Sequence, residues 1–504
     1  MLIENGTVRT LDRAKAVVTS LGIDGQHIVA HAEALERVDL RGRCVLPGFN
    51  DAHVHFPTWA LAQSQVDLDG ATSLEDATDR IREAIAGVRP GQLLRGYGWR
   101  SAQWADQPTR QVLDRLAGDI PVALISKDYH SLWLSSSALA RAKDDLQVPG
   151  GVVETDDRGE VTGILRERSA WHFRDRYMSA TDDEYVDAMR AGIGIAAARG
   201  VTAVHDKDGW LGALRLWSRL RAEGALSIRV WQTLPHDKVE DLRALGLASG
   251  FGDDSLRLGH LKVFMDGALG SQTAHMLDGS GVEITTRPEL VEMILQGVGA
   301  RFPLAVHAIG DRANREALSA FEETHAAWSG LGLRQRIEHA QLVAPDDIGR
   351  FARIGVAASV QFSHAPSDRD LADELWAGKT AGAYAYRSLA RSGAILANGS
   401  DAPVEELDPL AGIRAGVLRT LDERPPWQPE EALTVEEALE ATCVAPAWLA
   451  GDEHRRGRLM PGYVADLVVL DRDPVACATE ELVDVRVVAT MVGGRWVHNP
   501  PPWD

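Results

Sequence analysis

Short apolar runs that end in side chains able to bind metal recur along this chain, and they constrain its fold more than any other feature. The first run leads into His53-Val54-His55, and later runs contain Lys262 or end at His307, His339 and Asp401. Stretches rich in Ala, Leu, Glu and Arg separate these runs and predict helices. Strands that alternate with helices and carry functional residues at their carboxyl ends are typical of a (β/α)8 barrel, whose active site lies in the loops after the strands.

The pair His53 and His55 predicts half of a metal site. Alternate residues of a strand point to the same face, so both imidazoles can approach one cation. Neutral imidazole is a good ligand for zinc. An isolated pair of this kind is explained as readily by two strand-end histidines held by their neighbours. The ligand-type residues at the later strand ends favour the metal.

The order His-x-His, Lys, His, His, Asp resembles that of the metal-dependent amidohydrolase superfamily. Three longer phrases resemble its YtcJ-like branch, amidohydrolase family 3, which includes N-substituted formamide deformylase. These phrases are Leu261–Ala274, His307–Asn314 and Arg336–Gln341. The resemblance runs nearly end to end, from Gly6 to Trp496, and depends on the order and spacing of the motifs.

The resemblance implies an α/β fold with three parts. A (β/α)8 TIM barrel is expected over residues 46–445, and both chain ends, 1–45 and 446–504, are expected to form a small β-sandwich. The sequence itself predicts strands at both ends but not their pairing. The stretch of about 60–190 is long for one or two βα units, so we interpret it as an insertion that caps the active site at the barrel mouth and selects the substrate.

The resemblance also implies a site for two divalent metal ions, expected to be zinc. One ion would be bound by His53, His55 and Asp401, and the other by His307 and His339. A lysine ammonium between them has only donors and would repel both, but burial and nearby positive charge can deprotonate it. The resemblance then implies that Lys262 adds carbon dioxide and bridges the ions as N6-carboxylysine. The alternative is a buried lysine that pairs with Asp266 or extends its amine toward solvent.

Asp401 is expected to be the general base, with Lys262 and His339 completing the catalytic set. Zinc lowers the pKa of a bound water toward ~7, so a metal-bound hydroxide is expected as the nucleophile. Asp401 would take a proton as attack begins and pass it to the leaving nitrogen. The alternative is that Ser400-Asp401, before Ala-Pro, caps a helix.

Weaker candidates for substrate contacts lie outside this set. They are His130, Asp266, Arg312 and Trp99. At His130, the preceding Tyr129 replaces a glycine of the branch, and Asp266 lies in a Gly-rich loop. The guanidinium of Arg312 could bind an acidic group of the substrate through two parallel hydrogen bonds. Simple packing explains Trp99 as well, and an ion pair with Asp311 or Glu316 explains Arg312. Glu338 and Gln341 flank His339 and are expected to hold it. Five further histidines are interpreted as structural: His205, His260, His275, His364 and His454.

Composition excludes several classes of protein. The formal net charge of −20 argues against nucleic-acid or anionic-membrane binding. The first residues show no basic region followed by a long apolar stretch, and the sequence has no run of 18 or more apolar residues. Neither a signal peptide nor membrane association is therefore expected, and a cytoplasmic location is. The three cysteines lack the spacing of a zinc knuckle or a disulfide framework. Members of the resembled family are commonly dimers, so the resemblance makes a homodimer possible for this protein.

The sequence therefore predicts a metal-dependent hydrolase of a small-molecule substrate, cleaving a C–N bond of the amide or N-formyl type rather than a peptide bond. One alternative is a one-metal, deaminase-like hydrolase of an aminated heterocycle, against which the bridging lysine argues. Another is a non-catalytic binding protein on the same fold, against which the presence of all six ligand candidates argues.

Overall fold

The chain folds into two compact units. The structure, a computed structural model, describes residues 1–12, 14–30, 36–63, 65–68, 70–89, 91–99, 104–126, 131–142, 145–149, 151–270 and 272–503. The barrel unit comprises Met1–Trp59 with Met189–Asp504, and the insertion unit comprises Ala60–Ala188. The insertion unit spans nearly the same residues as the predicted insertion, and its role as a cap stays a prediction.

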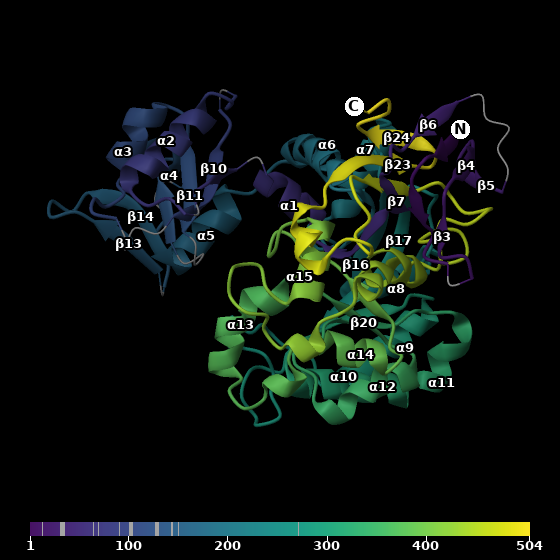
Figure 1. The fold of residues 1–504 in the computed structure, drawn as a ribbon. Helices are drawn as coiled ribbons and strands as arrows, with labels where there is room; N and C mark the ends of the chain where they lie inside the picture. The colour runs from purple at the N-terminus through teal and green to yellow at the C-terminus, as the bar shows by residue number, and fades with distance from the viewer. Residues whose placement is uncertain are drawn as a thin grey trace. The chain divides into compact units, whose positions relative to one another are not determined.

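A nearly closed barrel of parallel strands forms the centre of the barrel unit (Figure 1). Within the described residues its strands, in spatial order, are β8 (Phe49–Val54), β15 (Val201–Asp206), β16 (Arg229–Pro235), β17 (Leu256–Phe264), β18 (Leu304–Ala308), β19 (Arg336–His339), β20 (Ala357–Val360) and β21 (Leu396–Asn398). Successive neighbours pair in parallel. Just beyond β21, the backbone N–H of Asp401 donates to the His53 carbonyl at 2.6 Å. The (β/α)8 prediction is confirmed.

Helices between these strands cover the barrel, as in other parallel sheets that are buried on both faces. The helices of the barrel unit include α7 (Ala213–Ala222), α8 (Val239–Ala244), α9 (Arg287–Gly299), α10 (Asp311–Glu323), α11 (His325–Trp328), α12 (Pro345–Ile354), α13 (His364–Leu375), α14 (Tyr386–Arg391), α15 (Pro409–Leu418), α16 (Val435–Leu439) and α17 (Ala445–Leu449). In α10 the buried residues Ala313, Ala317 and Phe321 recur at the spacing of one helix face. The helices α1 (Phe56–Gln63) and α6 (Asp182–Ala198) run across the unit boundaries in the sequence.

Both ends of the chain join in one small β-sandwich. Its first sheet has the order β24 (Arg495–His498), β23 (Val487–Val492), β22 (Leu467–Leu470), β7 (Cys44–Pro47), β2 (Thr7–Arg9) and β3 (Val17–Val18). Its second sheet has the order β5 (His27–Val29), β4 (Leu21–Asp24), β1 (Leu2–Glu4) and β6 (Arg37–Asp39). Since β22 pairs antiparallel with β7 and residues of both ends share one apolar core, the predicted pairing of the chain ends is confirmed.

The insertion unit has its own sheet and its own core. The sheet has the order β13 (Gly151–Thr155), β14 (Val161–Glu167), β12 (Ser131–Leu134), β11 (Val122–Ser126), β10 (Leu94–Trp99) and β9 (Val66–Asp67). The helices of this unit include α2 (Leu74–Ile85), α3 (Arg110–Ala117), α4 (Ser136–Leu139) and α5 (Arg168–Tyr177).

Trp99 lies in the core of the insertion unit. It is 2% exposed, packs on Trp104 and Trp133, and donates its indole N–H to the Leu124 carbonyl at 2.9 Å. Trp99 is therefore a core side chain of this unit, and its role as a substrate contact stays a prediction.

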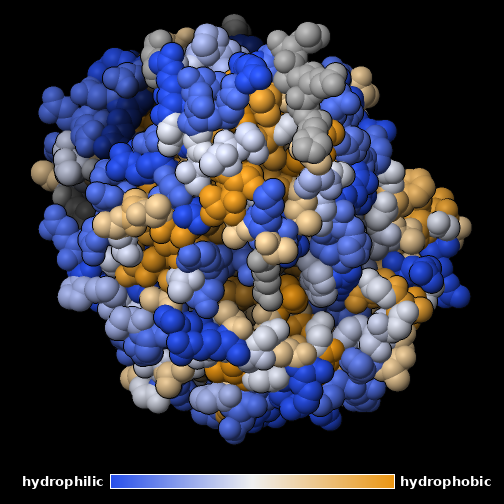
Figure 2. All heavy atoms as spheres, turned by 45° about the vertical axis from the view of Figure 1, so that its right-hand side comes forward, coloured by the Kyte–Doolittle hydropathy of each residue, from blue (hydrophilic) through white to orange (hydrophobic). Residues whose placement is uncertain are grey.

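The surface in view is mainly polar. Hydrophilic side chains predominate on the face in Figure 2, with hydrophobic patches between them. None of the described helices is long and apolar enough to cross a membrane.

Candidate metal centre

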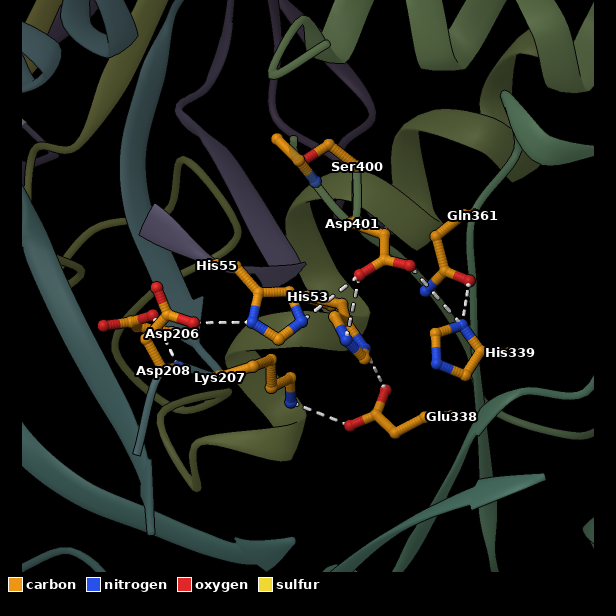
Figure 3. Close-up of polar contacts among 12 residues, drawn as sticks. His53, His55, Asp206, Lys207, Asp208, Glu338, His339, Gln361, Ser400 and Asp401 are labelled. Atoms are coloured by element: carbon orange, nitrogen blue, oxygen red, sulfur yellow. Dashed lines mark hydrogen bonds and ion pairs between the residues drawn. The ribbon is translucent and has the colours of Figure 1, made fainter. Parts of the chain in front are cut away.

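His53 and His55 converge on Asp401 at the carboxyl end of the barrel strands (Figure 3). The Nε2 atoms of His53 and His55 lie 3.3 and 3.6 Å from Asp401 Oδ1. Gly399 makes this approach possible, because a Cβ there would lie 2.4 Å from the backbone N of His53. Asp401 and His339 adopt φ angles of 58° and 73°, a region that L residues rarely occupy and that clusters at functional sites.

Carboxylates on the far side of both imidazoles orient them. His53 Nδ1 lies 2.8 Å from Glu338 Oε2, and His55 Nδ1 lies 2.7 Å from Asp208 Oδ1. An Nδ1–H that donates to a carboxylate leaves the Nε2 lone pair for a metal ion. Burial lowers the pKa of His53 well below its usual value, which keeps the ring neutral. For His55 burial acts in the same direction, but the hydrogen bond to Asp208 and the charges of Asp208 and Asp401 together outweigh it and raise the pKa.

The other two predicted histidine ligands lie beside this pair. The ring centroid of His339 is 4.8 Å from that of His53 and 4.6 Å from that of His307. His339 donates its Nδ1–H to Gln361 Oε1 at 2.9 Å, and His307 donates its Nε2–H to the Gly267 carbonyl at 2.9 Å. The nitrogen atoms that keep a free lone pair are therefore Nε2 of His339 and Nδ1 of His307. Burial lowers the pKa of His339 well below its usual value and that of His307 to about 3, so both rings are neutral.

The residues present fit a divalent metal ion. Ligand atoms of His53, His339 and Asp401 all lie within 4.8 Å of one another. The buried Nε2 of His53 has no hydrogen-bond partner among the described residues, which is unusual for a buried polar atom. Imidazole and carboxylate donors together are the ligands that zinc and similar ions take.

Lys262 lies on β17 next to these histidines, and it is 3% exposed. Its Nζ lies 5.1 Å from the ring centroid of Phe264. Burial lowers the pKa of Lys262, although the charges of Glu338 and Asp401 oppose the shift. Its predicted alternative partner, Asp266, accepts instead from the backbone N–H groups of His275, Ile309 and Gly310.

The same contacts hold the carboxylate of Asp266, whose role as a substrate contact stays a prediction. Its carboxylate is 1% exposed and satisfied by backbone N–H groups, so it supports the loops after β17 and β18. Arg312 is exposed near the start of α10. The two carboxylates considered as its partners make other contacts: Asp311 accepts from the Leu277 N–H, and Glu316 forms an ion pair with Arg287. A substrate role for Arg312 stays a prediction. His130 lies outside the described residues.

A buried charge network beneath the site was not predicted. Glu338 Oε1 lies 2.7 Å from Lys207 Nζ and 2.9 Å from Arg336 Nε, and all three side chains are fully buried. Glu338 thus holds His53 rather than its sequence neighbour His339. The alternation of side chains along a strand could have indicated the contact between Arg336 and Glu338, because residues 336 and 338 of β19 lie on the same face.

Residues just beyond the ends of β15 and β20 were also missed. Asp208 orients His55, and Gln361 orients His339. Gln341, expected to hold His339, contacts His364 Nδ1 instead at 3.1 Å. The position directly after a barrel strand, where functional residues of this fold lie, was the signal that could have identified these residues.

We expect Glu338→Gln to lower the free energy of unfolding of the metal-free protein by about 3–5 kcal/mol. The change would leave the cations of Lys207 and Arg336 buried without their anion. Urea unfolding measures this change in the free energy of unfolding. The matched control is Glu316→Gln, because Glu316 belongs to an ion pair nearer the surface. Equal stability of the two variants would contradict this account of the network.

Comparison with known proteins identifies the class that this fold and site define. The model of the amidohydrolase family matches residues 36–498, and the chain therefore belongs to the amidohydrolase family. It is 31% identical to the putative amidohydrolase YtcJ of Bacillus subtilis (strain 168), covering 92% of this chain and 90% of that one. It is 27% identical to N-substituted formamide deformylase of Arthrobacter pascens, covering 98% and 97%.

A solved structure supports the same assignment. An uncharacterized metal-dependent hydrolase from Pyrococcus horikoshii OT3 matches with a TM-score of 0.79 and 27% identity, over 95% of this chain and 99% of that chain. The predicted resemblance to the YtcJ-like branch is confirmed, and the chain is a member of a metal-dependent hydrolase family.

Proposed function

We propose that this protein hydrolyses an amide or N-formyl C–N bond of a small molecule, with Asp401 as the general base. The observation that carries the proposal is the convergence of His53 Nε2 and His55 Nε2 on one oxygen of Asp401, with both rings oriented by carboxylates. The similarity to N-substituted formamide deformylase supports the N-formyl class of substrate.

The oriented imidazoles would hold the metal. His53, His55 and Asp401 would bind one divalent ion, proposed to be zinc, and His307 and His339 a second. When bound, such ions polarise the scissile carbonyl and lower the pKa of a coordinated water. The carboxylates of Glu338 and Asp208 bind the Nδ1 side of His53 and His55, so that their Nε2 lone pairs would be available to the ion.

Asp401 is placed to transfer the proton. Its Oδ1 faces His53 and His55. Its Oδ2 lies 3.9 Å from His339 Nδ1 and 3.8 Å from His364 Nε2. As the water oxygen forms its bond to the carbonyl carbon, Asp401 accepts the water proton. When the C–N bond breaks, Asp401 returns this proton to the leaving nitrogen, so that an amine and a carboxylic acid are released.

Lys262 would supply the bridge between the two ions. Because burial lowers its pKa, more of its amine is neutral and can attack carbon dioxide. The new N–C bond gives a carbamate and releases one proton. The carbamate would supply oxygen ligands to the ions, whereas an ammonium would repel them.

The proposal is tested by metal content and by turnover of a defined panel. Freshly purified protein is expected to hold about two divalent ions per chain by elemental mass spectrometry, and to release amines from N-formyl or N-acyl amines. One ion per chain, with ammonia release from aminated heterocycles, would support the deaminase-like alternative instead. Failure to turn over either class would favour a binding protein on the same fold.

A further inference from the structure

We propose that His364 is a further catalytic residue, whose Nε2–H donates a hydrogen bond to the carbonyl oxygen of the substrate as that oxygen becomes negatively charged. This inference rests on the proposed hydrolytic function. It also corrects the interpretation of His364 as structural. His364 begins α13, directly after β20, and so lies on the edge of the barrel that carries Asp401.

The position of His364 is fixed by the segment that also orients His339. The backbone N–H of His364 donates to the Gln361 carbonyl at 3.1 Å, and the side chain of Gln361 accepts from His339. The rings of His364 and His339 are nearly parallel, 8° apart, with centroids 6.3 Å from each other. His364 therefore faces the metal centre as part of the same turn.

The hydrogen bond from Gln341 determines what His364 can offer. The Gln341 amide N–H donates to His364 Nδ1 at 3.1 Å, so the neutral ring carries its hydrogen on Nε2. This Nε2 is buried and has no hydrogen-bond partner among the described residues. Asp401 Oδ2, at 3.8 Å, is too far to accept from it. A buried N–H without a partner, beside the general base, is suited to an acceptor atom on the substrate.

The chemistry of the reaction explains why a donor is useful there. During attack on an amide, negative charge develops on the carbonyl oxygen. A donor held in place before the reaction stabilises this charge more than it stabilises the uncharged substrate. No bond of His364 is broken in this role, and its proton stays on Nε2.

Two substitutions separate this role from a structural one. The amide nitrogen of an asparagine corresponds to Nδ1 of histidine, and that of a glutamine to Nε2. We expect His364→Asn to lower kcat about 100-fold, with KM and metal content nearly unchanged, and His364→Gln to recover about tenfold of this loss. His325→Asn, at an exposed histidine of α11, is the matched control. Equal kcat for both His364 variants, or loss of metal, would overturn the proposal.

A binding measurement tests His364 without turnover. Methylphosphonate is a tetrahedral anion that resembles the attacked carbon, whereas formate is planar. In titration calorimetry of the metal-loaded protein, we expect His364→Asn to weaken methylphosphonate binding about tenfold or more and formate binding less. If no amide is hydrolysed but this difference is found, the proposed function fails and the donor role of His364 stands. Absence of methylphosphonate binding to the wild type, or equal weakening of both ligands, would contradict the donor role.

Discussion

Asp401→Asn is expected to lower kcat about 1000-fold or more, while the protein stays folded and keeps most of its metal. Asparagine has nearly the same shape, and its amide oxygen can still face His53 and His55. It cannot accept the proton of the attacking water or return it to the leaving nitrogen. Hydrolysis of the best substrate of the formamide and amide panel, together with metal content and circular dichroism, measures this effect.

A control for Asp401→Asn is available nearby in the chain. Asp408 accepts from the Ala411 N–H at the start of α15, and asparagine caps helices about as well as aspartate. Asp408→Asn should therefore leave kcat unchanged. If Asp401→Asn kept substantial activity, Asp401 would not be the general base. If it lost all its metal, its main role would be as a ligand.

Lys262→Ala is expected to abolish activity and to lower the metal content by about one ion per chain, because the bridging carbamate is lost. Acetate or propionate should restore part of both, since a short carboxylic acid can enter the space left by the side chain and supply the two missing oxygens. Metal analysis and turnover with increasing acetate measure the rescue.

Lys262→Arg provides the matched comparison. Arginine keeps a positive charge, fills the space and does not form a carbamate, so we expect neither activity nor rescue by acetate. Labelling of the wild type with ¹³C-bicarbonate, followed by carbon NMR, should show a carbamate signal that both variants lack. Full activity of Lys262→Ala would refute the carbamate bridge.

The sequence predicted the barrel because its evidence is local and repeated. Each apolar run with a ligand-type residue at its end is visible in a few neighbouring letters, and most of the strands were recognised in this way. The strand β16 (Arg229–Pro235) was not, because the buried polar residues Gln232 and Thr233 interrupt its apolar pattern. Parallel strands that are buried on both faces do not show a clear alternation.

The orientation of the ligands could not be predicted in the same way. Glu338 lies 285 residues from His53, and Asp208 lies 153 residues from His55. The register of strands far apart in the sequence determines which residues become such partners. Neighbours in the sequence did not predict the partner of His339, because Glu338 and Gln341 both hold other histidines. Trp99 shows the same limit, because the sequence does not distinguish a core side chain from a substrate contact.

The sequence by itself determined the fold class, the amidohydrolase family and the candidate ligand set, since strand ends and their order are encoded along the chain. Only the tertiary structure decided which nitrogen of each histidine is free, which carboxylate orients it, and that His364 presents a buried N–H beside Asp401. The physical reason is that hydrogen bonds between side chains depend on distances of about 3 Å, and closure of the barrel alone brings residues so far apart in the chain to that distance.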